Sequence, residues 1–302
     1  MYYCGWDGGG SKTEVSVTNQ NGDIIAEATF GALNSNGTTI EIINETIEKA
    51  IAFMKSVMTD LNNCKALVIG LAGISNKNTA TTVENSIRNF GYNGNLNLMG
   101  DHEIALAGAI KKQGAILIAG TGSICLCRNE TGEIFRCGGY GHIIDDEGSG
   151  YAIGRDIIKA VTKALDGRGE KTVLTELVYN YLKITDLNSL ISWIYSESTS
   201  KKDIAALAPL LMDALNKGDL IAINIAQNAS EELARLLISA FKKADISNGE
   251  IALMGSIFKY YEYIRAKTIK FIEKELPDAQ IIEPHLKASQ GAAKLAKEIF
   301  NI

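Results

Sequence analysis

The sequence predicts an α/β protein of two similar lobes around a cleft, with a large helical insertion in the second lobe. Three observations predict this fold class. The chain has 302 residues, which is long for one compact core. The order of expected strands and helices occurs twice along it. A glycine-rich turn occupies the same place in each half, between the first two strands.

The first half opens with expected strands at residues 2–6, 13–18 and 23–29, and Asn21-Gly22 is a hairpin signal. Ile40, Ile43, Ile47, Ile51 and Met54 recur at helical spacing, which predicts a helix over 39–58. The order β-β-β-α-β-α-β-α is completed by a strand at 66–71, a helix at 79–89, a strand at 96–99 and a helix at 103–111.

The second half repeats this order around a long helical stretch. Its first three strands are expected at 115–119, 123–128 and 133–137. The helical stretch covers 149–243, with breaks near 166–169, 186 and 218, and is followed by a strand at 250–254, a helix at 259–275, a strand at 280–282 and a helix at 286–300. We expect one lobe over 1–113, joined by the last helix at 287–302, and a second lobe over 114–286.

Composition excludes several classes of protein. The net charge of −5 offers nothing to nucleic acid or to an anionic membrane. No apolar run reaches the roughly 18 residues of a membrane span, and the first residues lack the pattern of a signal peptide. The five cysteines form no C-x-x-C pair, which favours reduced thiols and a cytoplasmic protein.

The first candidate site is the turn Asp7-Gly8-Gly9-Gly10-Ser11-Lys12-Thr13. Glycines let the backbone approach a ligand closely, and their N–H groups can point at phosphate oxygens. The hydroxyls of Ser11 and Thr13 and the charge of Lys12 suit the same ligand. The Asp7 carboxylate suits Mg²⁺ or its waters. The alternative is a hairpin turn that is merely rich in glycine.

The second candidate site is Gly120-Thr121-Gly122-Ser123, which holds the matching position in the second half. A dinucleotide-binding motif would need a third glycine where Cys125 stands, and a helix rather than a strand after it. Two glycine-and-hydroxyl turns in matching positions instead predict a pair of clamps on one polyphosphate.

The third candidate is Asp101, directly after the strand at 96–99 and Gly100. Ligands of open α/β sheets bind outside the carboxyl ends of the strands. A carboxylate there is placed to accept the proton of a substrate hydroxyl. The alternative is a helix N-cap, for which Asp is equally suited.

The fourth candidate is the segment from Cys137 to Gly150, with five glycines between 138 and 150 and the acids Asp145, Asp146 and Glu147 in sequence. This density of glycine favours a ligand-binding loop. A solvated turn before a helix is the alternative, because negative charge is favourable at that position. The three histidines are isolated and the cysteines lack zinc-site spacing, so a metal centre of that kind is not predicted.

Together these segments resemble the N-acetylglucosamine kinase branch of the BadF-type ATPases, within the ribonuclease H-like group of actin, hexokinase and Hsp70. The resemblance covers most of the chain and is strongest over the first 155 residues. The segment from Cys137 to Ser149 is the most specific, and it resembles that of bacterial kinases which also accept N-acetylmuramate. The other matching segments are Asp7 to Thr13, Leu33-Asn34-Ser35-Asn36, Gly70-Leu71-Ala72-Gly73, Asp101, Ala119 to Ser123, Gly255-Ser256 and Gln290 to Ala293.

The resemblance implies an ATP- and Mg²⁺-dependent, cytoplasmic and dimeric kinase that phosphorylates the 6-hydroxyl of an amino sugar, in cell-wall salvage. Asp101 would be the base. The sugar contacts would be Asn34, Asn36, Ala72, Gly73, Asp101, Cys137, Gly138, Gly139 and Asp146. The nucleotide contacts would be Gly9, Gly10, Ser11, Lys12, Thr13, Gly120, Thr121, Gly122, Ser123, Ala205, Gly255 and Ser256.

The chain also departs from the family pattern. Some relatives have Ser at the position of Ala72. Others have Trp at the position of Tyr140 and Gly at the position of Asp145. These differences mean that the resemblance does not identify which sugar is the substrate. A glucosamine or glucose kinase is therefore an alternative. An ATPase that activates a partner enzyme through an iron–sulfur cluster is another, and a sugar sensor without turnover is the third.

Overall fold

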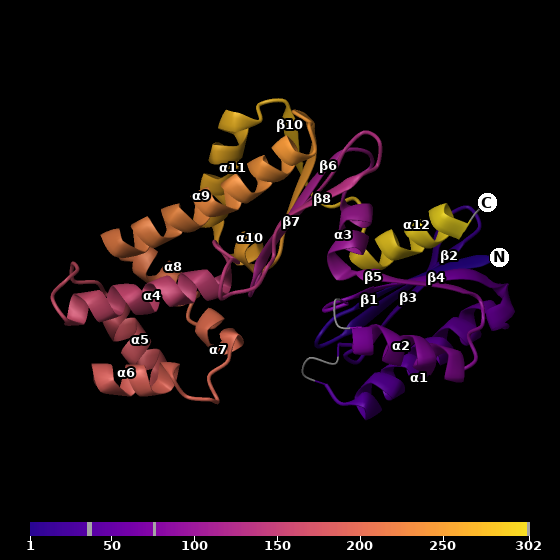
Figure 1. Cartoon of the computed structure of the whole chain (residues 1–302), viewed down its shortest axis with the longest axis horizontal. Coiled ribbons are helices and arrows are strands. Elements are labelled where there is room, and N and C mark those ends of the chain that lie inside the picture. The colour runs from indigo at the N-terminus through magenta and orange to yellow at the C-terminus, as the bar shows by residue number, and fades with distance from the viewer. Residues whose placement is uncertain (35–37, 75–76, 301–302) are drawn as a thin grey trace. The chain divides into compact units, whose positions relative to one another are not determined.

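The structure is a computed structural model, and it describes residues 1–34, 38–74 and 77–300, except the side chain of Lys77. These residues form two compact units, which are labelled by element in Figure 1. The first unit comprises Met1–Lys111 together with Glu283–Ile302, and the second comprises Lys112–Ile282.

The described part of the first unit contains a five-stranded sheet in the order β3-β2-β1-β4-β5. The strands β2 and β3 run antiparallel to their neighbours, whereas β4 and β5 run parallel to β1. The strands are β1 (Tyr2–Gly8), β2 (Thr13–Asn19), β3 (Ile24–Phe30), β4 (Cys64–Leu71) and β5 (Asn95–Gly100).

Helices cover both faces of this sheet, as Figure 1 shows. On one face, α1 (Ile40–Met58) and α2 (Lys77–Asn89) pack with Trp6 and the inward side chains of the strands. Ile43, Ile47 and Met54 of α1 are buried at helical spacing, whereas Ile40 is 43% exposed. On the other face lie α3 (Asp101–Ala109) and α12 (Ala288–Phe300), and a short 3-10 helix (Leu61–Asn63) precedes β4.

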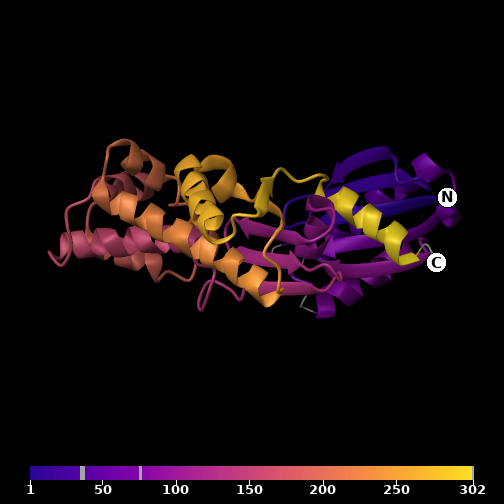
Figure 2. The same cartoon turned by 90° about the horizontal axis from the view of Figure 1, so that it is seen from above.

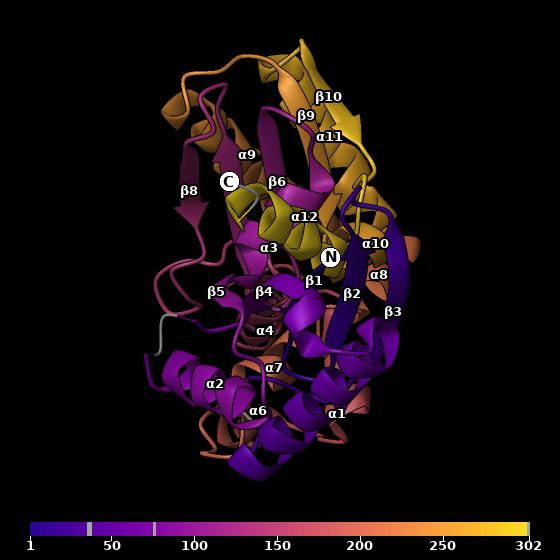
Figure 3. The same cartoon turned by 90° about the vertical axis from the view of Figure 1, so that its right-hand side faces the viewer.

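The sheet of the second unit repeats the first, with the order β10-β9-β6-β7-β8 in the described residues. Again the first three strands are antiparallel and the later two are parallel to the first. Figure 3 shows β8 and β10 at opposite edges. The strands are β6 (Gly114–Ala119), β7 (Ser123–Arg128), β8 (Ile134–Gly138), β9 (Gly249–Met254) and β10 (Ala279–Ile282). The predicted repeat of β-strand and helix order is confirmed.

The helical insertion lies within the second unit, and its long last helix packs against α11 (Glu262–Glu275; Figure 2). The three expected breaks are present: α4 ends before Asp166, while the carboxylates of Asp186 and Asp219 accept N–H groups at the starts of α6 and α9. Interruptions of the helical stretch at 195–200 and 206–209 were not predicted. The helices are α4 (Gly150–Leu165), α5 (Leu174–Leu182), α6 (Leu187–Ile194), α7 (Lys201–Ala205), α8 (Leu210–Asn216) and α9 (Leu220–Lys243).

One expected helix is divided in two, and another begins earlier than predicted. The helix expected over 259–275 is two helices, α10 (Ser256–Tyr260) and α11 (Glu262–Glu275), because Tyr261 adopts the non-helical angles φ −119° and ψ 77°. The helix expected from residue 103 begins at Asp101. None of the described helices is both long and apolar enough to cross a membrane.

Candidate functional site

The predicted residues of the first unit gather at the carboxyl edge of its sheet. In the parallel register, Asp7 pairs with Gly70, and Leu71 pairs with Gly100. The strands β1, β4 and β5 therefore end side by side. Asp7, Ala72 and Asp101 lie at this one edge, where open α/β sheets bind ligands.

The first glycine turn is closed by its own backbone and anchored beneath. The Gly9 N–H donates to Lys12 O at 3.0 Å, and Gly9 O accepts from the Leu33 N–H at 3.1 Å. Thr13 is buried and its hydroxyl donates to Gly31 O at 2.8 Å. The Thr13 hydroxyl therefore holds the turn in place and is not presented to a ligand, in contrast to the role expected from the sequence.

The tip of this turn is exposed at Gly10 and Ser11. Their N–H groups have no hydrogen-bond partner in the part of the chain that the structure describes. Lys12 is also exposed and its ammonium group pairs with the Glu14 carboxylate. A Cβ at Gly10 would meet no atom within 4 Å, so the fold itself does not require glycine there.

Asp101 is the first residue of α3 and does not cap it. The cap is Gly100, whose N–H donates to Glu103 Oε2 at 2.6 Å. Because Glu103, which the sequence analysis did not single out, takes the capping role, the N-cap interpretation of Asp101 is wrong. Asp101 Oδ1 accepts from the His102 N–H at 2.9 Å and lies 3.1 Å from His102 Nδ1. The Asp101 side chain is 44% exposed, which leaves Oδ2 accessible.

Asp7 lies close enough to Asp101 for the two charges to interact. Burial, followed by the negative charges of Asp101 and Glu14, raises the pKa of Asp7 from 3.8 to about 6, against the opposing effect of Lys12. The folded chain therefore disfavours the ionised form of Asp7. A cation bound beside it would reverse that preference.

The remaining predicted residues of this unit flank the same edge. The Ala72 N–H donates to Gly8 O at 3.2 Å, which fixes the start of the loop after β4. Gly73 is exposed and has a φ of +80°. Asn34 is partly buried directly after the buried Leu33. Asn36 lies outside the described residues.

The second glycine turn is held against the start of α4. The Gly120 N–H donates to Gly122 O at 2.9 Å, and the N–H groups of Gly150 and Tyr151 donate to the carbonyls of Gly120 and Thr121 at 2.7 and 3.2 Å. The N–H groups of Thr121 and Gly122 have no partner among the described residues. The turn thus presents two donors on a fixed backbone.

Predicted residues far apart in sequence surround this turn. A Cβ at Gly120 would lie 3.9 Å from Ser256 Oγ, and one at Gly150 would lie 3.5 Å from Ala205 Cβ. Gly255 has a φ of +97°, and a Cβ there would lie 2.2 Å from Ala119 O, so only glycine fits. The Ser123 hydroxyl donates to Glu147 O at 2.8 Å, which links the turn to the segment before α4.

The three consecutive acids have different surroundings. Asp145 Oδ2 accepts from the Tyr140 N–H at 3.0 Å. Glu147 forms a bidentate ion pair with Arg155, at 2.9 and 2.7 Å, which spacing in the sequence could not indicate. Asp146 has a left-handed φ of 63° and is only 5% exposed.

Asp146 therefore stands apart as the acid without a structural partner. No hydrogen bond to its carboxylate is present among the described residues. Its Oδ2 occupies the space that a Cβ at Gly122 would enter, at 2.7 Å. Its carboxylate is therefore available to accept a hydrogen bond from a ligand.

The cysteines of the second unit line one face of β7 and β8. Cys125 pairs with Cys137 across the strands, and Cys125 and Cys127 are fully buried. Burial raises the pKa of Cys127 to about 12 and that of Cys125 well above its usual value, so both remain protonated at neutral pH. Cys137 is half-buried at the start of the glycine-rich loop. Cluster ligation needs accessible thiolates, and this pair does not supply them.

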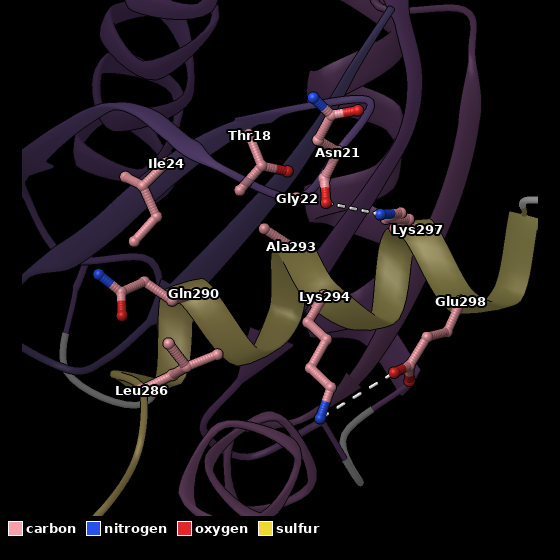
Figure 4. Close-up of a pocket in the computed structure, with 10 residues that line it drawn as sticks. All are labelled: Thr18, Asn21, Gly22, Ile24, Leu286, Gln290, Ala293, Lys294, Lys297 and Glu298. Carbon is pink, nitrogen blue, oxygen red and sulfur yellow. Dashed lines mark hydrogen bonds and ion pairs between the residues drawn. The ribbon is translucent and has the colours of Figure 1, made fainter. Parts of the chain in front are cut away.

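A cavity of about 470 Å³ lies between α12 and the β2–β3 hairpin, at the opposite end of the first unit's sheet (Figure 4). Thr18 lines the cavity and pairs with Tyr3 at the start of β1. Asp7 lies at the other end of β1, so the cavity is at the end of the sheet away from the candidate site. Lys297 Nζ donates to Asn21 O at 2.8 Å across it. None of the predicted site residues that the structure describes lines this cavity.

The two sheets, with the same strand order and connectivity and helices on both faces of the first, define a ribonuclease H-like protein of the actin/hexokinase type. A candidate N-acetylglucosamine kinase from Chromobacterium violaceum has the same fold, with a TM-score of 0.72, 24% identity and 98% of both chains covered. The model of the BadF/BadG/BcrA/BcrD ATPase family matches residues 4–296. The chain belongs to this family.

Two relatives are similar over nearly the whole chain. The N-acetylmuramic acid/N-acetylglucosamine kinase of Clostridium acetobutylicum is 36% identical, with 98% of both chains covered. The N-acetyl-D-glucosamine kinase of Dictyostelium discoideum is 31% identical, with 97% of both chains covered.

Proposed function

We propose that this chain is a kinase that transfers the terminal phosphoryl group of ATP to the 6-hydroxyl of an N-acetylated amino sugar, N-acetylglucosamine or N-acetylmuramate. The observation that carries the proposal is the accessible Asp101 carboxylate at the carboxyl edge of the first sheet. The names of the two relatives support the choice of substrate. The proposal includes a cytoplasmic homodimer that salvages cell-wall amino sugars.

In the first unit, Asp101 would bind the sugar hydroxyl through Oδ2 and take its proton as the phosphoryl group is transferred. Oδ1 is already engaged by His102, which fixes the orientation of the carboxylate. Asn34, Ala72 and Gly73 would line the sugar beside it. Kinases act mainly by positioning the reacting groups and stabilising charge. A carboxylate held in one orientation can position the sugar hydroxyl in this way.

In the second unit, the N–H groups of Thr121 and Gly122 would donate to the nucleotide phosphates. Ala205, Gly255 and Ser256 surround the same turn and would contact the adenosine. The sugar would lie along Cys137 to Gly139, with Asp146 accepting from its hydroxyls. Asp146 is preferred to Asp145 and Glu147 because those two carboxylates already have partners.

Mg²⁺ fits the carboxylate of Asp7. Kinase sites hold this ion with one or two carboxylates plus substrate phosphates, and the described residues form no ready-made cluster of three ligands. The raised pKa of Asp7 marks a carboxylate whose charge is uncompensated in the free protein. When bound, Mg²⁺ would offset charge on the transferring phosphoryl group.

Asp7→Asn is expected to stabilise the free protein above about pH 6. The pKa of Asp7 is raised to about 6, so the protonated carboxyl favours folding below about pH 4, and this contribution is lost as the pH rises through about 6. The substitution should raise the free energy of unfolding by about 1–3 kcal/mol at pH 8 and by much less at pH 4.5. Urea unfolding at both pH values measures the difference.

The same variant should lose most of its Mg²⁺-dependent ATP turnover, because the metal ligand is gone. An unchanged pH dependence of stability would show that Asp7 is not the titrating group. Full activity with improved stability would remove Asp7 from the metal site.

Gly10→Ala is expected to weaken ATP without weakening the fold. The added methyl group has no neighbour within 4 Å in the free protein, but it stands where phosphate oxygens would approach the turn. KM for ATP should rise about 10-fold or more, with the thermal midpoint unchanged. KM for the sugar serves as the internal control, and an unchanged KM for ATP would mean that this turn does not contact the nucleotide.

The decisive test is ADP release with Mg-ATP in the presence of N-acetylglucosamine, N-acetylmuramate, glucosamine, glucose or no sugar. Release that depends on the N-acetylated sugars supports the proposal, and phosphate at the 6-position of the product identifies the acceptor hydroxyl. A preference for glucosamine or glucose would change the substrate. Equal release without sugar would favour an activator ATPase, and sugar binding without release would indicate a sensor.

A further inference from the structure

Arg136 wraps around the turn that is proposed to carry the sugar. It lies on the edge strand β8, one residue before Cys137. Its Nε donates to Gly138 O at 2.9 Å and its Nη2 donates to Gly139 O. The guanidinium carbon lies 4.9 Å from the centroid of the Tyr140 ring, on which the group stacks. The guanidinium therefore has a fixed position beside this turn.

This guanidinium has no negative partner in the part of the chain that the structure describes. Its acceptors are two neutral carbonyls, and Nη1 has no partner there. Asp145 Oδ2 accepts from the Tyr140 N–H, and no ion pair joins Asp145 to Arg136 among the described residues. Other arginines do have carboxylate partners: Arg155 with Glu147, Arg168 with Asp166, and Arg235 with Glu232.

A partly buried cation held by neutral groups is suited to an anion supplied by a ligand. Guanidinium groups bind carboxylates through two parallel hydrogen bonds, and the free Nη1 edge can supply such donors. N-acetylmuramate carries a lactyl ether with a carboxylate at its 3-oxygen, where N-acetylglucosamine has only a hydroxyl. The two sugars therefore differ by the chemical group that Arg136 lacks.

We infer that Arg136 is a specificity residue that favours amino sugars bearing a carboxylate substituent, with N-acetylmuramate as the matching substrate. The inference rests on the proposed function. Arg136 binds the carboxylate and takes no part in the phosphoryl transfer. Its hydrogen bonds to Gly138 and Gly139 keep the guanidinium in place for this contact.

The competing explanation is that Arg136 only braces the turn. Loss of a purely structural contact would weaken the binding of both sugars equally, because both would lie along the same backbone. Selective loss of the acidic sugar is therefore the signature of carboxylate recognition. Comparing the two sugars in one variant separates the explanations.

The experiment compares the wild type with Arg136→Gln by calorimetric binding of each sugar and by kcat/KM for each. Arg136→Gln should weaken N-acetylmuramate by about 10–100-fold more than it weakens N-acetylglucosamine. Arg136→Lys keeps the positive charge but loses the planar guanidinium group that can form two parallel hydrogen bonds. This variant should retain part of the preference for N-acetylmuramate. Lys243→Gln is the matched control, because its ammonium group donates to Arg136 O at 3.2 Å and its loss should leave the ratio unchanged.

Equal losses for both sugars, or no change for either, overturn the inference, and the thermal midpoint of each variant shows whether it is folded. If either variant at Arg136 fails to fold, the other carries the comparison. A wild type that phosphorylates N-acetylglucosamine but does not bind N-acetylmuramate overturns the inference and leaves the proposed function intact. If the wild type phosphorylates neither sugar, the proposed function fails. Binding of N-acetylmuramate that depends on Arg136 would still support the inference in that case, and absence of binding would overturn it.

Discussion

Asp101→Asn is expected to reduce kcat by about 10²–10⁴ while leaving sugar affinity within a few fold. Asn can still accept a hydrogen bond from the sugar hydroxyl, so the sugar should bind. It cannot take the proton, so the attacking oxygen remains a poor nucleophile. The effect should be confined to turnover because Gly100 and Glu103, rather than Asp101, form the start of α3.

The measurement is ADP release at saturating sugar and Mg-ATP, with sugar affinity determined separately by calorimetry. Glu103→Gln is the matched control, since it changes a neighbouring carboxylate on the same helical turn and keeps an oxygen that can accept from the Gly100 N–H. This control should keep kcat within a few fold of the wild type. A near-normal kcat for Asp101→Asn would remove Asp101 from the chemistry and, with it, the observation on which the kinase proposal depends.

Gly291→Ala is expected to destabilise the first unit, although alanine is the better helix former. A Cβ at Gly291 would lie 2.3 Å from Ile104 O and 2.5 Å from Gly108 N, both of them backbone atoms of α3. Backbone cannot move aside as a flexible side chain can, so α12 would have to shift away from α3. Helix propensity favours Ala by about 1 kcal/mol. We expect the clash to exceed this and to lower the free energy of unfolding by about 1–3 kcal/mol.

Urea unfolding measured by fluorescence and far-UV circular dichroism tests this expectation. Gly10→Ala is the control, because it adds the same methyl group to the same unit where no atom lies within 4 Å. Its stability should equal that of the wild type. A Gly291→Ala protein that is as stable as the wild type, or more stable, would show that α12 and α3 cross less closely than the structure has them.

Much of the fold follows from local patterns. The spacing of Ile43, Ile47 and Met54 predicts α1, and these residues are buried in the structure. Strands separated by glycine turns predict two sheets with the same order, and both are present. These patterns are local because helix and strand periodicity depend on neighbouring residues. Boundaries do not follow from periodicity alone, because the helix expected over 259–275 is interrupted at Tyr261.

Local patterns also predict the candidate site residues. They do not predict the different surroundings of each residue. Glycine clusters after strands mark both turns, and Asp101 follows a strand directly. The sequence could not tell whether Asp101 caps a helix, because the answer depends on which carboxylate receives the Gly100 N–H. It also could not distinguish Asp145, Asp146 and Glu147, because their partners include Arg155 and the backbone of Tyr140.

The sequence by itself therefore determined the class of fold, the order of its elements and the segments that carry the candidate site. Only the tertiary structure decided that the Asp146 carboxylate has no hydrogen-bond partner among the described residues, that Thr13 is buried beneath its turn, and that Arg136 stacks on Tyr140. It alone shows that Gly291 meets α3, more than 180 residues earlier in the chain. The physical reason is that periodicity is a property of adjacent residues, whereas burial, charge partners and close crossings are set by residues that meet only after folding.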